Sequence, residues 1–130
     1  MSRKALFLAA LIVVLVLMNG CASKQKKLTA ADNNRQVDLG VGDSILIELN
    51  GNPSTGYTWT AKDLDTSIFQ QVGDPEFKSS NPGLIGSGGS LTLIFKTLKT
   101  GTTTLMLVYH RPWETDVKPQ DTFTVSVVVK

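Results

Sequence analysis

The 130-residue sequence contains one cysteine and one histidine, and only 18% of its side chains are charged and 7% aromatic. A lone cysteine excludes a disulfide within the chain and a four-thiolate zinc site, and a lone histidine excludes a metal centre built from imidazoles. The apolar fraction of 42% argues against a disordered chain, and the length is that of one domain. We therefore expect one folded domain with no metal and no cofactor.

Positive charge is scarce in most of the chain, although the formal net charge is +2. Five of the 13 basic side chains precede residue 28, and residues 28–130 hold 8 basic and 11 acidic side chains, a net charge of −3. A mildly acidic domain has no electrostatic attraction to phosphate backbones, which dominate nucleic-acid affinity. Nucleic acid is thus not an expected partner.

The amino terminus carries the one long hydrophobic run, the 14 residues from Ala5 to Met18, after the basic pair Arg3-Lys4. A membrane-spanning helix needs about 20 apolar residues, whereas the apolar part of a signal peptide has about 7 to 15. The run is therefore interpreted as an export signal over residues 1–20.

The end of this run, Asn19-Gly20-Cys21, resembles the lipobox of bacterial lipoproteins, although Met18 and Asn19 depart from its usual residues. The resemblance implies that Cys21 carries acyl chains and becomes the first residue of the mature protein. It also implies the outer membrane as destination, since Ala22 rather than Asp follows the cysteine. The alternative is a periplasmic or secreted protein that is cleaved near Ala22-Ser23.

Residues 22–35 contain almost no large apolar side chains and show no sustained period. Together with the lipidated Cys21 they are predicted to form a flexible tether over residues 21–35, ahead of a domain at 36–130. A short helix around Leu28–Ala31 is the alternative. Three lysines in this segment, Lys24, Lys26 and Lys27, either keep it soluble or attract anionic lipid head groups.

From residue 36 the apolar residues recur with a period of two, as in half-buried strands. Gly and Pro separate the segments, and no window has a helical stripe. About seven short strands without crossover helices predict an all-β, antiparallel two-sheet sandwich of immunoglobulin-like type, with Trp59 in its core. The expected strands cover 37–39, 44–49, 57–61, 68–72, 91–96, 103–109 and 122–129.

Three polar loops interrupt this pattern: the Asn-Pro loop (50–57), the glycine-rich loop (79–90) and the Arg-Pro-Trp loop (110–116). Pro53 and Pro112 restrict the backbone, and a Trp between Pro112 and Glu114 is typical of an exposed recognition residue. The corresponding connections of an immunoglobulin-like sandwich lie at one end. We therefore expect the three loops to meet.

The loops offer little to catalysis or nucleotide binding. The glycine-rich loop has Leu91 where a dinucleotide fingerprint needs Gly, and no P-loop lysine follows. Ser87 lacks the first Gly of a nucleophile elbow, since Ile85 stands there. A triad of His110 and Asp116 with Ser54 or Ser87 would have to form across loops, and we expect no enzymatic activity.

Taken together and in order, the three motifs resemble the chagasin-like family of cysteine-peptidase inhibitors over residues 36–130, with Ser54 where the family more often has Thr. The resemblance implies a tight, reversible inhibitor of papain-like peptidases, including cathepsin-type enzymes. The implied peptidase-binding residues are Asn52, Pro53, Ser54, Thr55, Gly56 and Tyr57, then Gly86, Ser87, Gly88 and Gly89, and finally Arg111, Pro112 and Trp113.

By the same resemblance, Thr55 lies nearest the catalytic thiol, the glycines line the non-primed arm of the cleft, and Trp113 anchors the opposite side. We expect a monomer. Two other classes of function share the scaffold: a surface module for adhesion or ligand binding, and a lipoprotein of envelope assembly. Neither predicts all three motifs, and fold alone does not decide between them.

Overall fold

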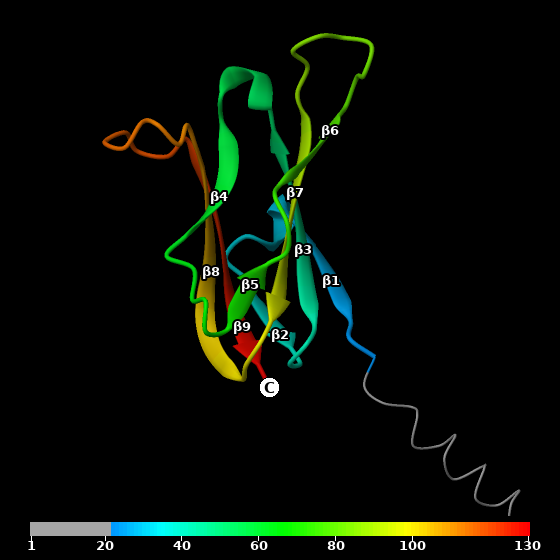
Figure 1. The fold of residues 1–130 in the computed structure, drawn as a ribbon, viewed down its shortest axis with the longest axis vertical. Coiled ribbons are helices and arrows are strands. Elements are labelled where there is room, and N and C mark those ends of the chain that lie inside the picture. Colours follow the sequence, from blue (N-terminus) through cyan, green and yellow to red (C-terminus); the bar gives the residue numbers. More distant parts are fainter. Residues whose placement is uncertain (1–21) are drawn as a thin grey trace, which may run out of the picture.

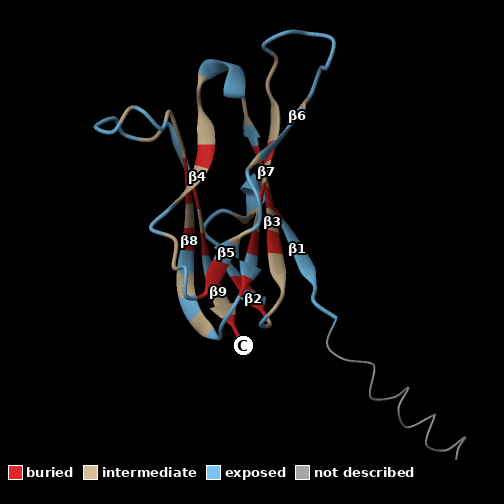
Figure 2. Cartoon of the chain, viewed as in Figure 1, coloured by how far each residue is buried: buried red, intermediate tan, exposed pale blue. Residues whose placement is uncertain are grey.

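The computed structural model describes residues 22–130, so the predicted signal peptide and Cys21 lie outside the described residues. Two β-sheets pack face to face and enclose one apolar core (Figures 1 and 2). Within residues 22–130 the only helices are two 3-10 turns, η1 (Ala30–Asp32) and η2 (Pro53–Thr55), and no helix is long and apolar enough to cross a membrane. The predicted all-β sandwich is confirmed.

The first sheet has the order β1-β3-β7-β5, and β6 also pairs with β7. Its strands are β1 (Gln25–Thr29), β3 (Ser44–Gly51), β5 (Phe69–Gln71), β6 (Glu76–Ser79) and β7 (Gly89–Thr97). The second sheet has the order β2-β9-β8-β4. Its strands are β2 (Gln36–Leu39), β4 (Thr58–Lys62), β8 (Gly101–His110) and β9 (Asp121–Val129).

The period-two pattern places one face of each long strand in the core. Most inward side chains of β3, β7, β8 and β9 are almost completely buried, whereas most of their neighbours along each strand are half-buried or exposed. Trp59 is 3% exposed, as predicted for a core residue. The apolar strand β9 lies between β2 and β8, so its hydrogen-bonding edges are covered.

All seven predicted strands form, but the sheets are mixed rather than antiparallel. β1 pairs with β3 and β2 pairs with β9 in parallel. The reason is that both short strands belong to the amino-terminal segment, which crosses from the edge of one sheet to the edge of the other. The expectation of a purely antiparallel sandwich was therefore wrong at these two edges.

The tether predicted for residues 21–35 is also wrong from residue 25 onward. Gln25–Thr29 pairs with Ser44–Glu48, and the side chain of Leu28 enters the core with 2% exposure. Lys27 forms an ion pair with Glu48 at 3.4 Å. One buried apolar side chain is enough to attach β1 to the edge of the sheet. The backbone hydrogen bonds to β3, which need no sequence pattern, hold the rest of the strand.

Strand β6 was not expected. Its residues Glu76–Ser79 are exposed or only partly buried, and Phe77 is 39% exposed. Phe77 is the one apolar side chain of this four-residue strand, and a single apolar residue makes no period, so the period-two criterion does not detect β6. β6 extends the first sheet alongside the upper part of β7, beside the glycine-rich loop (Figure 1).

The burial of Leu28 yields a test of this fold. We predict that Leu28→Ala lowers the free energy of unfolding by about 2 to 5 kcal/mol, because the substitution leaves a cavity in the core. Urea denaturation of the soluble chain that starts at Ala22 measures this. Lys26→Ala, on the exposed part of the same strand, should stay within about 0.5 kcal/mol of wild type. Equal stabilities of the two variants would restore the tether interpretation.

Candidate functional site

The three loops singled out in the sequence lie at one end of the sandwich (Figure 1). The Asn-Pro loop joins β3 to β4, the glycine-rich loop joins β6 to β7, and the Arg-Pro-Trp loop leads from β8 towards β9. Side-chain contacts connect the Asn-Pro loop to each of the other two. The predicted convergence is confirmed, with the Asn-Pro loop in the centre.

An aromatic stack supports the loops from below. Tyr109, near the end of β8, stacks on the buried Trp59 with ring centroids 5.1 Å apart, and its other neighbour Tyr57 is 5.2 Å away. The Tyr109 hydroxyl accepts a hydrogen bond from the backbone amide of Asn52 at 2.9 Å. The Trp59 indole donates to the carbonyl of Asn50 at 2.9 Å. The start of the Asn-Pro loop is thus hydrogen-bonded to the aromatic stack, and its last residue, Tyr57, packs on Tyr109.

The Asn-Pro loop is a 3-10 turn closed by its own side chains. Asn52 caps the turn, since its side-chain oxygen accepts from the backbone amide of Ser54 at 3.2 Å and from the Ser54 hydroxyl at 2.6 Å. Pro53 occupies the first position of the turn, where no amide hydrogen is needed. The Asn52 carbonyl accepts from the amide of Thr55 at 3.2 Å and from its hydroxyl at 2.6 Å.

Gly56 ends the turn in the left-handed conformation, with φ 84°. A Cβ atom at this position would lie 2.4 Å from the Trp113 ring, so only glycine fits. Trp113 therefore packs its ring edge on the Asn-Pro loop, yet remains 68% exposed. The predicted exposure of this tryptophan is confirmed.

The glycine-rich loop is attached to the Asn-Pro loop by the same asparagine. The Asn52 amide nitrogen donates to the carbonyl of Gly86 at 3.1 Å, and Gly86 has φ 79°. Within the loop, Ser87 and Ser79 share a hydrogen bond at 2.8 Å, and the Gly88 carbonyl accepts from the amide and hydroxyl of Ser80. A Cβ at Gly89 would lie 2.1 Å from the Lys78 carbonyl, so this glycine allows β6 to approach β7.

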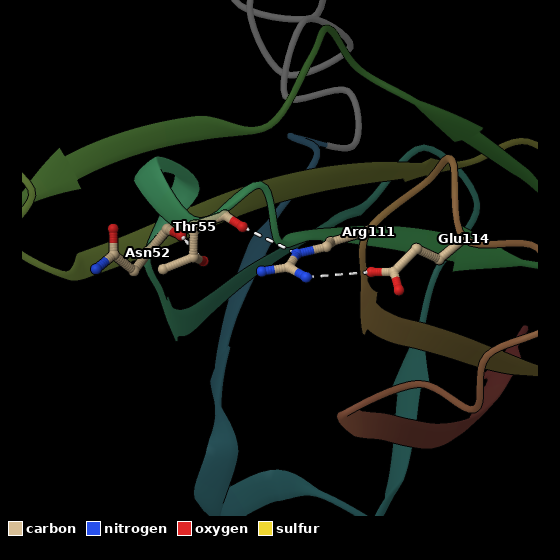
Figure 3. A network of polar contacts seen from close by, with 4 residues as sticks. All are labelled: Asn52, Thr55, Arg111 and Glu114. Carbon is tan, nitrogen blue, oxygen red and sulfur yellow. Dashed lines mark hydrogen bonds and ion pairs between the residues drawn. The ribbon is translucent and has the colours of Figure 1, made fainter.

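Arg111 connects the third loop to the first (Figure 3). Its Nε donates to the Thr55 carbonyl at 3.0 Å, and one terminal nitrogen lies 3.4 Å from the Glu114 carboxylate. The guanidinium also lies over the Tyr57 ring, 4.6 Å from its centroid. The planar group therefore makes three kinds of contact at once, which a lysine could not reproduce.

The arrangement contains no assembled catalytic centre. The His110 ring nitrogen Nε2 bonds the Thr60 hydroxyl at 2.7 Å, away from Ser54 and Ser87, whose hydroxyls are held by Asn52 and Ser79. The triad left open by the sequence does not form. Among residues 22–130 no group of three His, Cys, Asp or Glu side chains could hold a metal ion. What the loops present is a stiff, largely uncharged surface.

Several contributors to this surface escaped the sequence analysis. Leu84 and Ile85, at the tip of the glycine-rich loop, are 60% and 103% exposed. Two adjacent apolar residues in a loop of Ser, Gly and Asn are a signal that could have found them. Tyr109 was predicted only as the last residue of the strand 103–109. Its contacts with both Trp59 and Asn52 depend on strand register, which composition does not reveal.

Comparison with known proteins places these loops in a family. The sequence profile of the "Chagasin family peptidase inhibitor I42" matches residues 38–127, which include all three loops. The chain belongs to this family. Members of this family are peptidase inhibitors rather than enzymes, and the chain is one of these inhibitors.

Named relatives span the same region. Amoebiasin-2 from Entamoeba histolytica is 36% identical over 104 residues, 79% of this chain and 84% of the relative. Chagasin from Trypanosoma cruzi is 29% identical over 104 residues, 76% of this chain and 93% of the relative. The crystal structure of a cysteine protease inhibitor from Entamoeba histolytica is 34% identical and superposes with a TM-score of 0.73, covering 85% of this chain and all of that one. The immunoglobulin-like sandwich of the chagasin family is thus confirmed.

The contact between Gly56 and Trp113 of this chagasin-family protein can be tested with two glycines. We predict that Gly56→Ala destabilises the fold by more than Gly42→Ala. Both residues have a positive φ, which costs a non-glycine residue about 1 to 3 kcal/mol, but only Gly56 has a neighbour within 4 Å of the added carbon. Urea denaturation of the two variants gives the difference.

The matched double variant Gly56→Ala with Trp113→Ala removes the ring that the added carbon would meet. Relative to Trp113→Ala, this double variant should lose only the stability that backbone strain costs, as in Gly42→Ala. If Gly56→Ala and Gly42→Ala lose equal stability, the packing of Trp113 on Gly56 is not a significant constraint.

Proposed function

We propose that this chagasin-family protein is a reversible, tight-binding inhibitor of papain-like cysteine peptidases, including cathepsin-type enzymes. The three loops at one end of the sandwich block the active-site cleft. One observation carries the proposal: Asn52 and Arg111 join three loops into a single preorganised edge. The Entamoeba histolytica relative described as a cysteine protease inhibitor supports the class of target.

The conformation of the Asn-Pro loop explains why the target would not cleave it. A papain-like peptidase attacks a carbonyl through a thiolate paired with an imidazolium, and attack requires an aligned, accessible substrate carbonyl. Here the carbonyls of Asn52, Pro53 and Thr55 already accept hydrogen bonds from Thr55, Gly56 and Arg111 respectively. The 3-10 turn would fill the cleft around Thr55 without presenting an extended peptide bond.

The two outer loops would contact the arms of the cleft on either side. The glycine-rich loop offers backbone groups at Gly86 and the exposed side chains of Leu84 and Ile85. The opposite arm would receive Trp113, whose exposed ring is the largest apolar side chain of the surface. Aromatic residues of this kind often dominate binding energy in protein interfaces.

Rigidity favours affinity because side chains that are already ordered lose little entropy on binding. An interface of about 1,600 Å² with such loops is compatible with nanomolar binding, roughly −12 kcal/mol. The proposed affinity therefore requires no covalent bond and no cofactor.

A titration of papain with a fluorogenic peptide substrate tests the function. The soluble chain from Ala22, which retains β1, should abolish peptidase activity at micromolar concentration or below. Trp113→Ala should weaken inhibition by about 2 kcal/mol or more, roughly 30-fold, because it removes the proposed anchor. Val72→Ala, an exposed apolar residue outside the three loops, is the control and should inhibit like wild type.

Undiminished papain activity in the presence of the wild-type chain would reject the proposal. It would favour the two other classes of function, a surface module for adhesion or an envelope-assembly lipoprotein. An unchanged inhibition constant for a folded Trp113→Ala variant would reject only the anchoring role of this residue.

We also propose that acyl chains on Cys21 hold the inhibitor at the bacterial envelope, at the outer membrane. The motif Asn19-Gly20-Cys21 and the following Ala22 support this. Several acyl chains give stable anchoring, whereas a single chain gives only marginal binding.

Fractionation of cells that produce the full chain tests the anchor. Wild type should sediment with membranes, and Cys21→Ser should move to the soluble fraction because the acylated sulfur is lost. Ser23→Ala, two residues further on, is a control and should remain with the membranes. Wild type in the soluble fraction would establish the periplasmic or secreted alternative.

A further inference from the structure

The end of the sandwich opposite the three loops also has exposed apolar side chains. Val41, in the turn between β2 and β3, is 52% exposed, and Leu98, in the turn between β7 and β8, is 44% exposed. Lys99 lies in the same turn as Leu98, and hydrogen bonds attach the backbone amides of Lys24 and Lys130 to Asp43 and Leu39, beside the β2–β3 turn. We call this set of five residues the basal surface.

Hydrogen bonds between backbone groups make the basal surface one unit. The Gly42 amide donates to the Thr97 carbonyl at 3.1 Å, so the turns that carry Val41 and Leu98 are adjacent. The Lys130 amide donates to the Leu39 carbonyl at 2.8 Å. The buried hydroxyl of Thr97 reinforces the contact, since it lies within hydrogen-bond distance of two carbonyls of the β2–β3 turn.

The incoming chain is fixed at this same surface. The Lys24 amide donates to the Asp43 carboxylate at 2.9 Å, and the Lys24 carbonyl accepts from the Ser44 amide at 2.9 Å. Only Ala22 and Ser23 separate Lys24 from Cys21 in the sequence. Even fully extended, such a short connection spans only about 10 Å.

The basal surface contains lysines that can reach an anionic partner. In the described part of the chain, none of its three lysines takes part in an ion pair. The nearest carboxylates are engaged: Asp43 accepts from the amides of Lys24 and Gly40, and Asp65 accepts from Ser67. These hydrogen bonds lower the pKa of both carboxyl groups, which therefore stay ionised at neutral pH and offset part of the lysine charge; the longer lysine side chains can extend their ammonium groups beyond these short carboxylates.

We propose that the basal surface rests on a bilayer containing anionic phospholipid. Val41 and Leu98 enter the head-group region, and Lys24, Lys99 and Lys130 lie against the phosphates. Exposed apolar side chains surrounded by lysines are the composition that binds at membrane interfaces. Each lysine near an anionic leaflet contributes attraction that decays within a Debye length. The proposal rests on acylation of Cys21, which brings this surface to the bilayer.

This orientation determines where the inhibitory loops stand. The 10 residues of β8 run from the basal end to Tyr109 and the loops, a length of about 33 Å (Figure 1). With the basal surface on the membrane, the three loops point away from it. A soluble peptidase could then reach them without contact between its own surface and the lipid.

Single cysteines introduced into the acylated chain test the contact, because acylation leaves Cys21 without a free thiol. Val41→Cys and Leu98→Cys are labelled with an environment-sensitive fluorophore, and Ile85→Cys is the matched control at the opposite end. The labelled chains are reconstituted in vesicles of phosphatidylethanolamine and phosphatidylglycerol. We expect a blue shift and quenching by lipid-borne quenchers at positions 41 and 98 only. Fluorescence at these positions equal to that at position 85 would overturn the proposal.

A spacer distinguishes affinity of the surface from mere proximity. About 20 Gly and Ser residues inserted between Ala22 and Ser23 have a mean span of about 25 Å, enough for the domain to leave the bilayer. Continued quenching at positions 41 and 98 supports the proposal, and its loss overturns it. Phosphatidylcholine vesicles should reduce the quenching, and undiminished quenching there would overturn the role of anionic lipid.

The mass of each purified chain confirms its acyl groups before reconstitution. Papain inhibition by the chains labelled at positions 41 and 98, which lie far from the binding edge, reports on the loops. Failure of the anchor, of the loops and of the basal surface can therefore be told apart.

Discussion

The position of Tyr109 is the constraint on which the rest of the binding edge depends. Its ring contacts both the core residue Trp59 and the loop residue Tyr57, and its hydroxyl accepts a hydrogen bond from the backbone amide of Asn52. Aromatic pairs of this kind contribute about 0.5 to 1.5 kcal/mol beyond the area they bury. Since Asn52 in turn holds Gly86, and Tyr57 lies under Arg111, one side chain at the end of β8 determines the relative positions of all three loops.

The loops depend on one another through backbone carbonyls rather than through charge. Arg111 makes the one ion pair among them, with Glu114 of its own loop, and otherwise bonds the Thr55 carbonyl. Hydrogen bonds to backbone groups survive high salt better than exposed ion pairs, which are screened. Such an edge keeps its shape whatever the ionic strength of the medium, which suits a protein whose task is to remain preorganised.

The sequence predicted the features that depend on local pattern and failed on those that depend on register. Alternation along β3, β7, β8 and β9 revealed the sandwich, and Pro53 indicated a loop with a restricted backbone. The strands β1 and β6 escaped because each contains one large apolar side chain, Leu28 or Phe77, and a single apolar residue makes no period. The hydrogen bond between Asn52 and Gly86 joins residues 34 positions apart, and local composition does not predict a contact at that separation.

The parallel pairing of β2 with β9 has a consequence for how the chain is made. Gln36 pairs with Ser126, so the second sheet joins the first part of the domain to its last nine-residue strand. Contacts this distant in sequence form late and slowly, because the intervening loop must close first. The sandwich can close only after β9 has emerged from the ribosome. Until then β2 and β8 lack the strand that pairs with both of them, and the apolar side chains of the second sheet stay uncovered.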